Sequence, residues 1–253
     1  MSPLELALIA LAGVAAGTIN TVVGSGTLVT FPTLLAFGVP PVTANVSNTI
    51  GLVPGSVTGA LGYRRELSGQ RARVLHLASA SLTGGLSGAL LLLWQPGLFG
   101  AIVPALIGLG IVLVLAGPRI SRWVASRHES TGGLPERGAW WVWPAMFACG
   151  VYGGYFGAAQ GVLMMAIMGI GINEGLQRLN GVKNVLAAVV NGVAGILFAL
   201  VADVDWTVVV VIAVGAVIGG LIGASVGRRL PPVVLRALIV TVGVVALVVF
   251  VAK

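Results

Sequence analysis

Long apolar runs, interrupted by Gly, Pro and Asn, dominate the hydrophobic pattern of this chain. Residues 6 to 63, 77 to 118, 138 to 173 and 206 to 227 contain no Asp, Glu, Lys or Arg. A helix that crosses a bilayer needs about 20 consecutive apolar residues, and each run meets or exceeds that length. The pattern therefore predicts an all-α membrane protein that crosses the bilayer several times.

The Gly, Pro and Asn breaks divide the chain into about ten helical segments. In the first half we expect helices at about 4 to 22, 26 to 37, 45 to 62, 73 to 94 and 98 to 117. In the second half we expect them at about 140 to 157, 161 to 171, 180 to 201, 206 to 228 and 232 to 251. We therefore divide the chain into a first membrane repeat, 1 to 117, a cytoplasmic linker, 118 to 139, and a second membrane repeat, 140 to 253.

We describe the two halves as repeats because Gly, Pro and Asn residues recur at a constant spacing of 135 residues, as from Asn45 to Asn180 (180 − 45 = 135). Gly26 and Gly161 share this spacing, and the remaining breaks follow it without a gap. Most other aligned positions share only apolar character. The repeated breaks predict two halves with the same series of helices.

The loops give the two halves opposite orientations. The loop after the third helix of the first half carries Arg64, Arg65, Arg71 and Arg73, whereas its counterpart carries Asp203 and Asp205. Lys and Arg accumulate in cytoplasmic loops. We therefore expect the arginine loop and the linker in the cytoplasm, both termini outside, and inverted topology for the second repeat.

Inversion requires an odd number of crossings in each repeat, so two of the five helices must enter and leave on the same side. Residues 4 to 37 would span about 50 Å as one helix at 1.5 Å per residue, and Gly24-Ser25-Gly26 interrupts them. We expect a V-shaped re-entrant hairpin here and in the second repeat, followed each time by three transmembrane helices. Non-helical backbone at this depth must be surrounded by protein or a watery cavity, so the two tips should meet.

The amino-acid composition agrees with a membrane location and argues against nucleic-acid binding. The chain is 57% hydrophobic and 8% charged, with a mean hydropathy of +1.05, too apolar for a soluble globule of this length. The net charge of +7 lies in short loops between apolar segments, which indicates topology rather than nucleic-acid binding. The expected partners are the lipid bilayer and a small anion, and a homo-oligomer is left open.

Features of enzymes and metal sites are missing from the sequence. The single cysteine, Cys149, excludes an internal disulfide and a CxxC pair, and there is no HExxH motif. Paired carboxylates within the apolar segments are absent as well. We therefore expect neither catalysis nor a cofactor nor a metal, and rank a membrane-embedded enzyme or redox carrier last.

Polar residues inside the apolar sequence mark the candidate binding site. Both halves place a Gly-rich break and a polar helix start at the same position of the repeat, a pattern typical of a midplane site in transporters. Free N–H groups at helix starts, amides, hydroxyls and one lysine would suit an anion. The candidate substrate-binding residues are Asn20, Gly24, Ser25, Gly26, Asn45, Asn48, Gln160, Gly161, Asn180, Lys183, Asn184 and Asn191.

Simpler roles stay open for several of these residues. Asn45 and Asn180 could cap helices without binding a ligand. Lys183 could extend its ammonium group to the inner membrane interface. The same polar tips could also line an anion channel, which would conduct without alternating conformations.

At these residues the chain resembles the sulfite exporter TauE/SafE family, also described as the toluene sulfonate uptake permease family. The resemblance rests on GTINTVVGSGTLVTFPTLLAFGVPPVTANVSNTIGLVPGSVTGALGYRREL at 17 to 67 and on GVYGGYFGAAQGVLMMAIMGIGINEGLQRLNGVKNVLAAVVNGVAGILF at 150 to 198. One departure is the short Gly24-Ser25-Gly26-Thr27 and Ala159-Gln160-Gly161 breaks, where many members carry longer Gly runs.

The resemblance implies a multi-pass carrier in the bacterial inner membrane for small sulfur-containing anions such as sulfite, sulfonates or sulfoacetate. The leading hypothesis is a secondary transporter with alternating access, in which the two hairpin tips enclose the anion near the midplane. The alternative is the anion channel. The resemblance fixes neither the particular anion nor the direction of transport.

Overall fold

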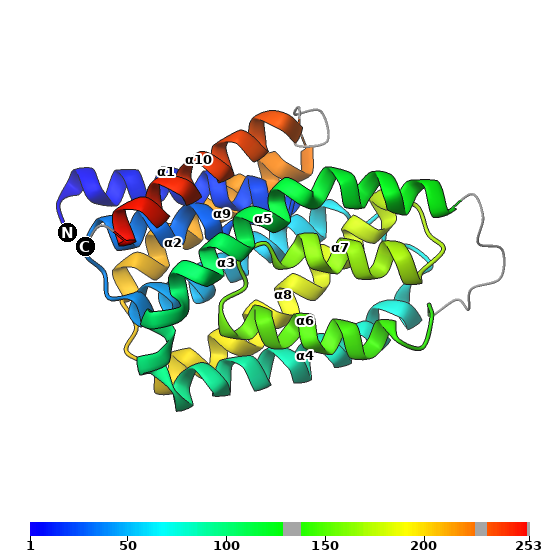
Figure 1. Ribbon diagram of the computed structural model, residues 1–253, viewed down its shortest axis with the longest axis horizontal. Helices are drawn as coiled ribbons and strands as arrows, with labels where there is room; N and C mark the ends of the chain where they lie inside the picture. Colours follow the sequence, from blue (N-terminus) through cyan, green and yellow to red (C-terminus); the bar gives the residue numbers. More distant parts are fainter. Residues whose placement is uncertain (129–137, 226–231, 252–253) are drawn as a thin grey trace.

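The computed structural model describes residues 1–128, 138–225 and 232–251, and these residues form an all-helical bundle (Figure 1). The described helices of the first half are α1 (Pro3–Val22), α2 (Thr27–Ala36), α3 (Pro41–Gly62), α4 (Arg71–Trp94) and α5 (Pro96–His128). Those of the second half are α6 (Val142–Tyr155), α7 (Gln160–Gly171), α8 (Leu176–Val201), α9 (Trp206–Ser225) and α10 (Pro232–Val251). Each expected helix is present.

Three described boundaries differ from the sequence prediction by four residues or more. Helices α3 and α8 begin at Pro41 and Leu176, one turn before the expected starts at 45 and 180. In α3, proline fits the first turn of the helix, where its missing N–H has no intrahelical role, and this signal outweighs the polar residues that follow; α8 begins after Gly175 instead. Helix α5 continues to His128, into the predicted linker. The rest of that linker, 129–137, and the expected end of the ninth helix at 228 lie outside the described residues.

The path of the chain reverses within each half. Both termini lie at one end of the bundle, and α5 ends at the opposite end (Figure 1). Helices α1 and α2 form a pair that opens toward the termini. Helices α6 and α7 form a pair that faces the opposite way, with its connecting break inside the bundle. At the other end, the N–H of Ala139, just before α6, donates to the carbonyl of Gly171, at the end of α7, at 2.8 Å.

Helices of the two halves are interleaved in the bundle. Helix α1 packs on α9 and α6 packs on α4, while α3 contacts both α8 and α9, and α8 contacts both α3 and α4. Glycines permit these close contacts: a Cβ at Gly17 would lie 2.4 Å from the Ala216 carbonyl oxygen, and one at Gly84 would lie 2.3 Å from that of Phe147. Small residues at helix crossings are typical of membrane bundles.

The outward faces of the bundle are apolar. Helix α4 exposes Leu75, Leu82 and Leu90, while α9 exposes Val210 and other aliphatic residues along its length. Five described helices, α1, α4, α5 (to Ile120), α8 and α9, are long and apolar enough to cross a bilayer. A helix that is apolar on its exposed face as well as its packed face requires a lipid environment. The chain is a multi-pass membrane protein.

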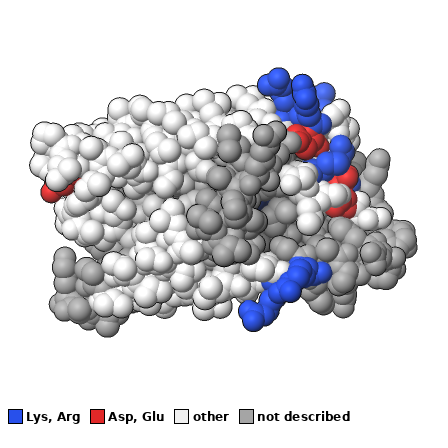
Figure 2. Space-filling view, turned by 90° about the horizontal axis from the view of Figure 1, so that it is seen from above, with Lys and Arg blue, Asp and Glu red and all other residues white. Residues whose placement is uncertain are grey.

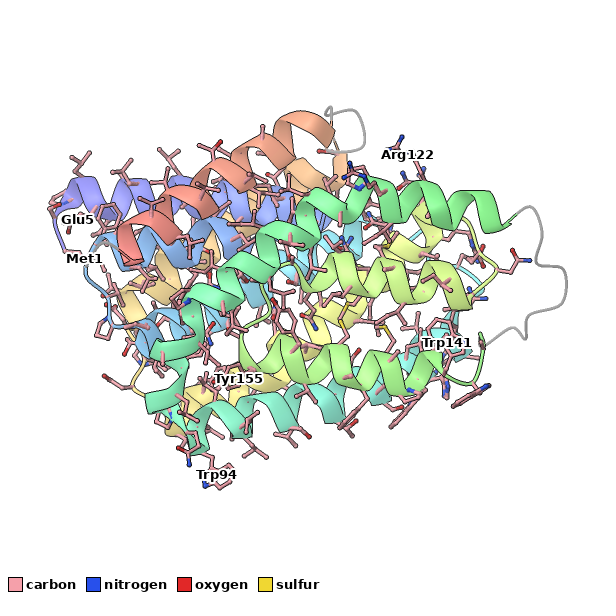
Figure 3. The ribbon with its side chains drawn as sticks, in the orientation of Figure 1. Met1, Glu5, Trp94, Arg122, Trp141 and Tyr155 are labelled. Carbon is pink, nitrogen blue, oxygen red and sulfur yellow. The ribbon has the colours of Figure 1, made fainter. Side chains whose placement is uncertain are left out.

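Charge is distributed unevenly between the two ends. Lys and Arg gather at one end of the molecule (Figure 2), and Glu5 lies at the other (Figure 3). Figure 3 places Arg122 at the end where α5 finishes, opposite Met1 and Glu5, with Trp94 and Trp141 at opposite ends of the bundle. We call the end that carries Arg122 the arginine-rich end.

A polar cluster joins the two halves at the arginine-rich end. Arg73 at the start of α4 donates to Glu174 in the α7–α8 loop at 2.9 Å, and Arg178 in α8 donates to the same carboxylate at 2.9 Å. Arg178 also donates to the Ser68 carbonyl at 3.0 Å, while Gln70 donates to the Arg178 carbonyl at 3.3 Å. We call these residues the Glu174 cluster.

Candidate functional site

The two breaks, at 23–26 and 156–159, come together inside the bundle. The Gly161 N–H donates to the Gly24 carbonyl at 2.9 Å. A Cβ at Gly24 would lie 2.3 Å from the Gly161 Cα, and a Cβ at Gly161 would lie 2.4 Å from the Gly24 Cα. Gly24 has a φ of +85°, which favours glycine. Neither position has room for a side chain, because main chain lies against main chain.

The carboxyl end of α1 collects three side-chain donors from α8. Lys183 Nζ donates to the carbonyls of Asn20 and Thr21, each at 3.0 Å. Asn180 and Asn184 donate to the same Thr21 carbonyl at 3.3 and 3.2 Å. The last carbonyls of a helix lack intrahelical partners and form the negative end of its dipole. An ammonium and two amides from the second half stabilise this helix end.

Lys183 lies beside the contact between the breaks. Its side chain is fully buried, and its Cδ lies 3.1 Å from where a Cβ at Gly161 would be. The interpretation of Lys183 as a snorkelling residue at the membrane interface is therefore wrong. Its described hydrogen-bond partners are main-chain carbonyls, so helix-end dipoles rather than a carboxylate counter its charge.

Asn45 and Asn180 lie one turn inside α3 and α8, and neither caps its helix. Asn45 Nδ2 donates to the Tyr155 carbonyl at the end of α6 at 3.0 Å, as Asn180 does to Thr21 at the end of α1. Both amide oxygens, Asn45 Oδ1 and Asn180 Oδ1, are buried without a hydrogen-bond partner. Each asparagine thus joins one half to the helix end of the other and keeps a spare acceptor.

The aligned residues Asn48 and Lys183 have different environments. Asn48 is buried and accepts a hydrogen bond from the Thr30 hydroxyl, and its Nδ2 lies 3.5 Å from Thr27 Oγ1. These partners belong to α2 in the same half, whereas Lys183 reaches α1 in the other half. The neutral amide therefore links α3 to α2, and the charged side chain links α8 to α1.

Ser56 lies between two other candidates. Asn20 Nδ2 donates to Ser56 Oγ at 3.2 Å, and Asn191 Nδ2 donates to it at 3.5 Å. Ser56 and Asn191 are themselves aligned at the spacing of 135 residues (191 − 56 = 135). This contact brings α1, α3 and α8 together.

The tip residues Ser25, Gly26 and Gln160 complete the candidate set. Ser25 is buried and its hydroxyl has no hydrogen-bond partner. Gly26 allows α2 to approach α1, since a Cβ there would lie 2.5 Å from the Ala16 carbonyl. Gln160 Nε2 donates to the Cys149 carbonyl at 3.3 Å, so it ties α7 to α6.

Aromatic packing holds the second break in place. The Phe156 ring lies edge-to-face with Phe31 of α2, with 5.1 Å between ring centroids, and with Phe99 of α5 at 5.8 Å. Such pairs add to the stability that burial supplies. The break is therefore irregular in backbone but fixed in position.

The electrostatics of this region favour an anion near Lys183. The seven acidic residues of the sequence are Glu5, Glu66, Glu129, Glu136, Glu174, Asp203 and Asp205, all outside the breaks and the helix segments against them. No group of three or more His, Cys, Asp or Glu that could hold a metal is found among the described residues. Buried amides, a free serine hydroxyl and one ammonium remain, which can hydrogen-bond and neutralise an anion.

Sequence reasoning missed the main-chain acceptors of this site. The carbonyls of Asn20, Thr21 and Tyr155 accept hydrogen bonds from the polar side chains. Every residue has a carbonyl, so a sequence indicates only where a helix ends and not which of its carbonyls act as acceptors. The Thr30 contact with Asn48 was also missed. The helix start at the break was predicted to within one residue, but the sequence does not show that α3 packs against the face of α2 that carries Thr30.

The described residues form ten helices, interleaved in two halves around a buried lysine and a set of asparagines, and these features define a class of multi-pass membrane protein. The chain belongs to the sulfite exporter TauE/SafE family, whose model matches residues 9–250. It is similar to the probable membrane transporter protein YfcA of Escherichia coli strain K12, 28% identical over 97% of this chain and 89% of the relative. It is also similar to the probable membrane transporter protein ORF9 of Sinorhizobium sp, 26% identical over 94% of this chain and 89% of that protein.

Proposed function

We propose that this protein is a secondary transporter that carries small sulfur-containing anions, of the sulfite, sulfonate or sulfoacetate type, across the cell membrane by alternating access. The family's description supports a sulfur anion, and both relatives carry names of probable membrane transporters. The observation that carries the proposal is the buried Lys183 at the contact between the two breaks. A charge at that depth is costly and typically marks a substrate pathway.

The anion site in this proposal lies on the Lys183 side of the contact. Lys183 neutralises the anion, and the Asn184 amide and the unpaired Ser25 hydroxyl donate to its oxygens. Asn20 and Asn191, which already share Ser56, lie within the same three-helix contact and supply further donors. Asn180 and Gln160 hold the helix ends that frame the site.

The transport cycle follows from the competition for Lys183. In this structure its ammonium donates to the carbonyls of Asn20 and Thr21. An arriving anion competes for those N–H groups, which weakens the link between α8 and the end of α1. Because one main-chain hydrogen bond joins Gly24 to Gly161, the two breaks can separate toward either end of the bundle.

We further propose that the two halves are inverted repeats in which α1–α2 and α6–α7 are re-entrant hairpins. Their opposite openings support this, as do the exchanged contacts of α1 with α9 and α6 with α4. The contact between the aligned Ser56 and Asn191 is a third support, since equivalent residues meet only near a two-fold axis. Inverted halves can exchange conformations. This exchange gives an outward-open state and an inward-open state that are structurally equivalent.

The membrane potential sets the energetics of this transport. With the cell interior negative, moving a monoanion outward is favourable by about 2.3 kcal/mol per 100 mV. Export therefore needs no coupled ion. Import of the same anion requires a second driving force.

Binding of sulfite, a short sulfonate, sulfate and chloride to the purified protein tests the proposal, with thermal stability as the readout. We expect one sulfur anion to raise the melting temperature of the wild type but not of Lys183→Met, which keeps the side-chain volume and removes the charge. Arg122→Met removes an exposed positive charge at the arginine-rich end and serves as the matched control. Sulfur-anion stabilisation that survives in Lys183→Met would contradict the assigned site.

Counterflow in proteoliposomes separates the carrier from the channel. A carrier loaded with unlabelled anion on one side takes up labelled anion faster, because the loaded protein returns faster than the empty one. A channel shows no such acceleration. The absence of exchange acceleration for the anion that stabilises the protein would overturn alternating access.

A further inference from the structure

The carboxyl end of α6 lacks the cation that stabilises the carboxyl end of α1. Both ends receive an amide from the aligned asparagines, Asn45 at Tyr155 and Asn180 at Thr21. At α1 the ammonium of Lys183 also binds the carbonyls. The residue aligned with Lys183 in the first half is Asn48, which is neutral. The negative end of the α6 dipole is thus left without a positive charge from that position.

Oxygen acceptors face this second helix end from α3. Asn45 is fully buried, its Nδ2 lies 3.0 Å from the Tyr155 carbonyl oxygen, and its Oδ1 has no hydrogen-bond partner. Asn48 lies three residues further on, on the same face of the helix. Asn48 Oδ1 accepts one hydrogen bond, from Thr30, and an amide oxygen has two lone pairs. Asn45 Oδ1 and the Tyr155 carbonyl therefore lie together at this helix end, and Asn48 Oδ1 lies one turn further along α3, against α2.

We propose that a monovalent alkali cation, Na⁺ in the first instance, binds at the carboxyl end of α6 against Asn45 and Asn48. The ion does for α6 what the ammonium of Lys183 does for α1. Discontinuous helices in transporters use such carboxyl ends and freed carbonyls to coordinate Na⁺. The role of the ion in transport rests on the proposed anion carrier, but its binding does not.

The ligand set selects a monovalent ion. Ca²⁺ sites in proteins are built largely from carboxylates, and the described hydrogen-bond partners of the Asn45 and Asn48 side chains are a carbonyl and two hydroxyls. Neutral carbonyl and amide oxygens suit an ion of single charge. An ion of that charge also matches the ammonium group that occupies the corresponding helix end.

A bound Na⁺ supplies the driving force that import requires. One Na⁺ moving inward with one monoanion carries no net charge, so the inside-negative potential no longer opposes entry. The inward Na⁺ gradient then drives accumulation of the anion. The Lys183 ammonium then stabilises the carboxyl end of α1, and the bound Na⁺ stabilises the carboxyl end of α6, in the same conformation of the protein.

Thermal stability of the purified protein in NaCl, KCl and choline chloride tests the inference at constant ionic strength and without any sulfur anion. We expect a saturable rise in melting temperature with Na⁺, of roughly 3–6 °C at ten times its Kd. Equal melting temperatures in the three salts would overturn the site. Because chloride is the same in all three salts and no sulfur anion is present, this result is independent of the sulfur-anion experiment.

Two variants assign the site to Asn45 and Asn48. Asn45→Asp adds a carboxylate to the ligand set and should lower the Kd for Na⁺ at least tenfold. Asn48→Lys places an ammonium at the position aligned with Lys183 and should abolish the Na⁺ response while keeping the stability of the Na⁺-bound wild type. Arg122→Met, which changes an exposed side chain at the arginine-rich end, is the control and should keep the response. An unchanged Na⁺ response in both Asn45→Asp and Asn48→Lys would show that the ion binds elsewhere.

Discussion

Gly161 lies in close contact with both Gly24 and Lys183. Its N–H donates to the Gly24 carbonyl, and its lack of a side chain leaves room for the Lys183 side chain. A Cβ there would lie 2.4 Å from the Gly24 Cα and 3.1 Å from the Lys183 Cδ. The backbone of the two breaks would have to separate to admit a methyl group. A larger side chain at Gly161 would therefore disrupt the contact between the two halves.

We expect Gly161→Ala to destabilise the protein by about 1–3 kcal/mol, the usual cost of overpacking, and to reduce transport strongly. Urea or thermal denaturation and anion uptake measure the two effects. Gly108→Ala is the control, because a Cβ at Gly108 meets nothing within 4 Å and alanine favours the helix. Transport by Gly161→Ala at the rate of Gly108→Ala would contradict a functional role for the close contact.

The sequence predicted the residues of this region better than their partners. Lys183, Asn180 and Asn184 stood out as polar residues in apolar sequence, and the structure brings all three to one helix end. That they donate to carbonyls of α1 could not be foreseen, because a pattern of side chains does not reveal which helix ends face them. The capping role considered for Asn45 was wrong for the same reason, since it depended on a helix start four residues later than the real one.

At the scale of helices and loops, the Glu174 cluster links the two halves at the arginine-rich end. Partial burial disfavours the charged carboxylate, but hydrogen bonds from Arg73 and the Gly175 N–H, with the positive charges of Arg178 and Arg73, lower the pKa of Glu174 overall. A lowered folded-state pKa means that the ion pairs stabilise the fold fully above the ordinary carboxyl pKa. That stability is lost as pH falls through the folded-state value.

Glu174→Gln should therefore lower the free energy of unfolding by about 1–2 kcal/mol at pH 7. The difference from the wild type should shrink as pH falls through the lowered folded-state pKa of Glu174, since the wild-type carboxyl then becomes protonated as well. Denaturation at several pH values measures it, with the exposed Asp203→Asn as a control. A difference that stays constant down to pH 3 would show that charge at Glu174 contributes nothing.

Helices were predicted more accurately than the segments between them. All ten helices are present at the expected places, because bilayer thickness and Gly or Pro breaks constrain long apolar runs. The linker was shortened by α5, which runs on to His128. Arg119 and Arg122 ended the apolar pattern, but arginine is a good helix former, so the end of the hydrophobic run and the end of the helix do not coincide.

The whole molecule has two chemically distinct ends, and these predict its orientation. The arginine-rich end should face the cytoplasm, where Lys and Arg in short loops are retained. The opposite end carries both termini, Glu5 and the α8–α9 loop with Asp203 (Figures 1 and 3). Charge asymmetry alone would hold the bundle in this direction.

Single-cysteine labelling checks the orientation, and the chain is well suited to it because its one cysteine, Cys149, can be replaced by alanine. In that background we expect an impermeant thiol reagent to label Asp203→Cys in intact cells. Arg65→Cys, in the loop between α3 and α4, should react only after the membrane is opened. Labelling of Arg65→Cys in intact cells would reverse the assignment.

The packing of α1 on α9 and of Lys183 on the end of α1 has a consequence for synthesis of the protein. Helix α1 leaves the ribosome first. The lysine that binds its carbonyls is made 162 residues later (183 − 21 = 162), and the helix that it packs against begins 184 residues later (206 − 22 = 184). Until then the polar end of α1 has no partner from the second half. The nascent first half must therefore be held in the insertion machinery or in a partly hydrated state, and the bundle closes only when nearly the whole chain has been translated.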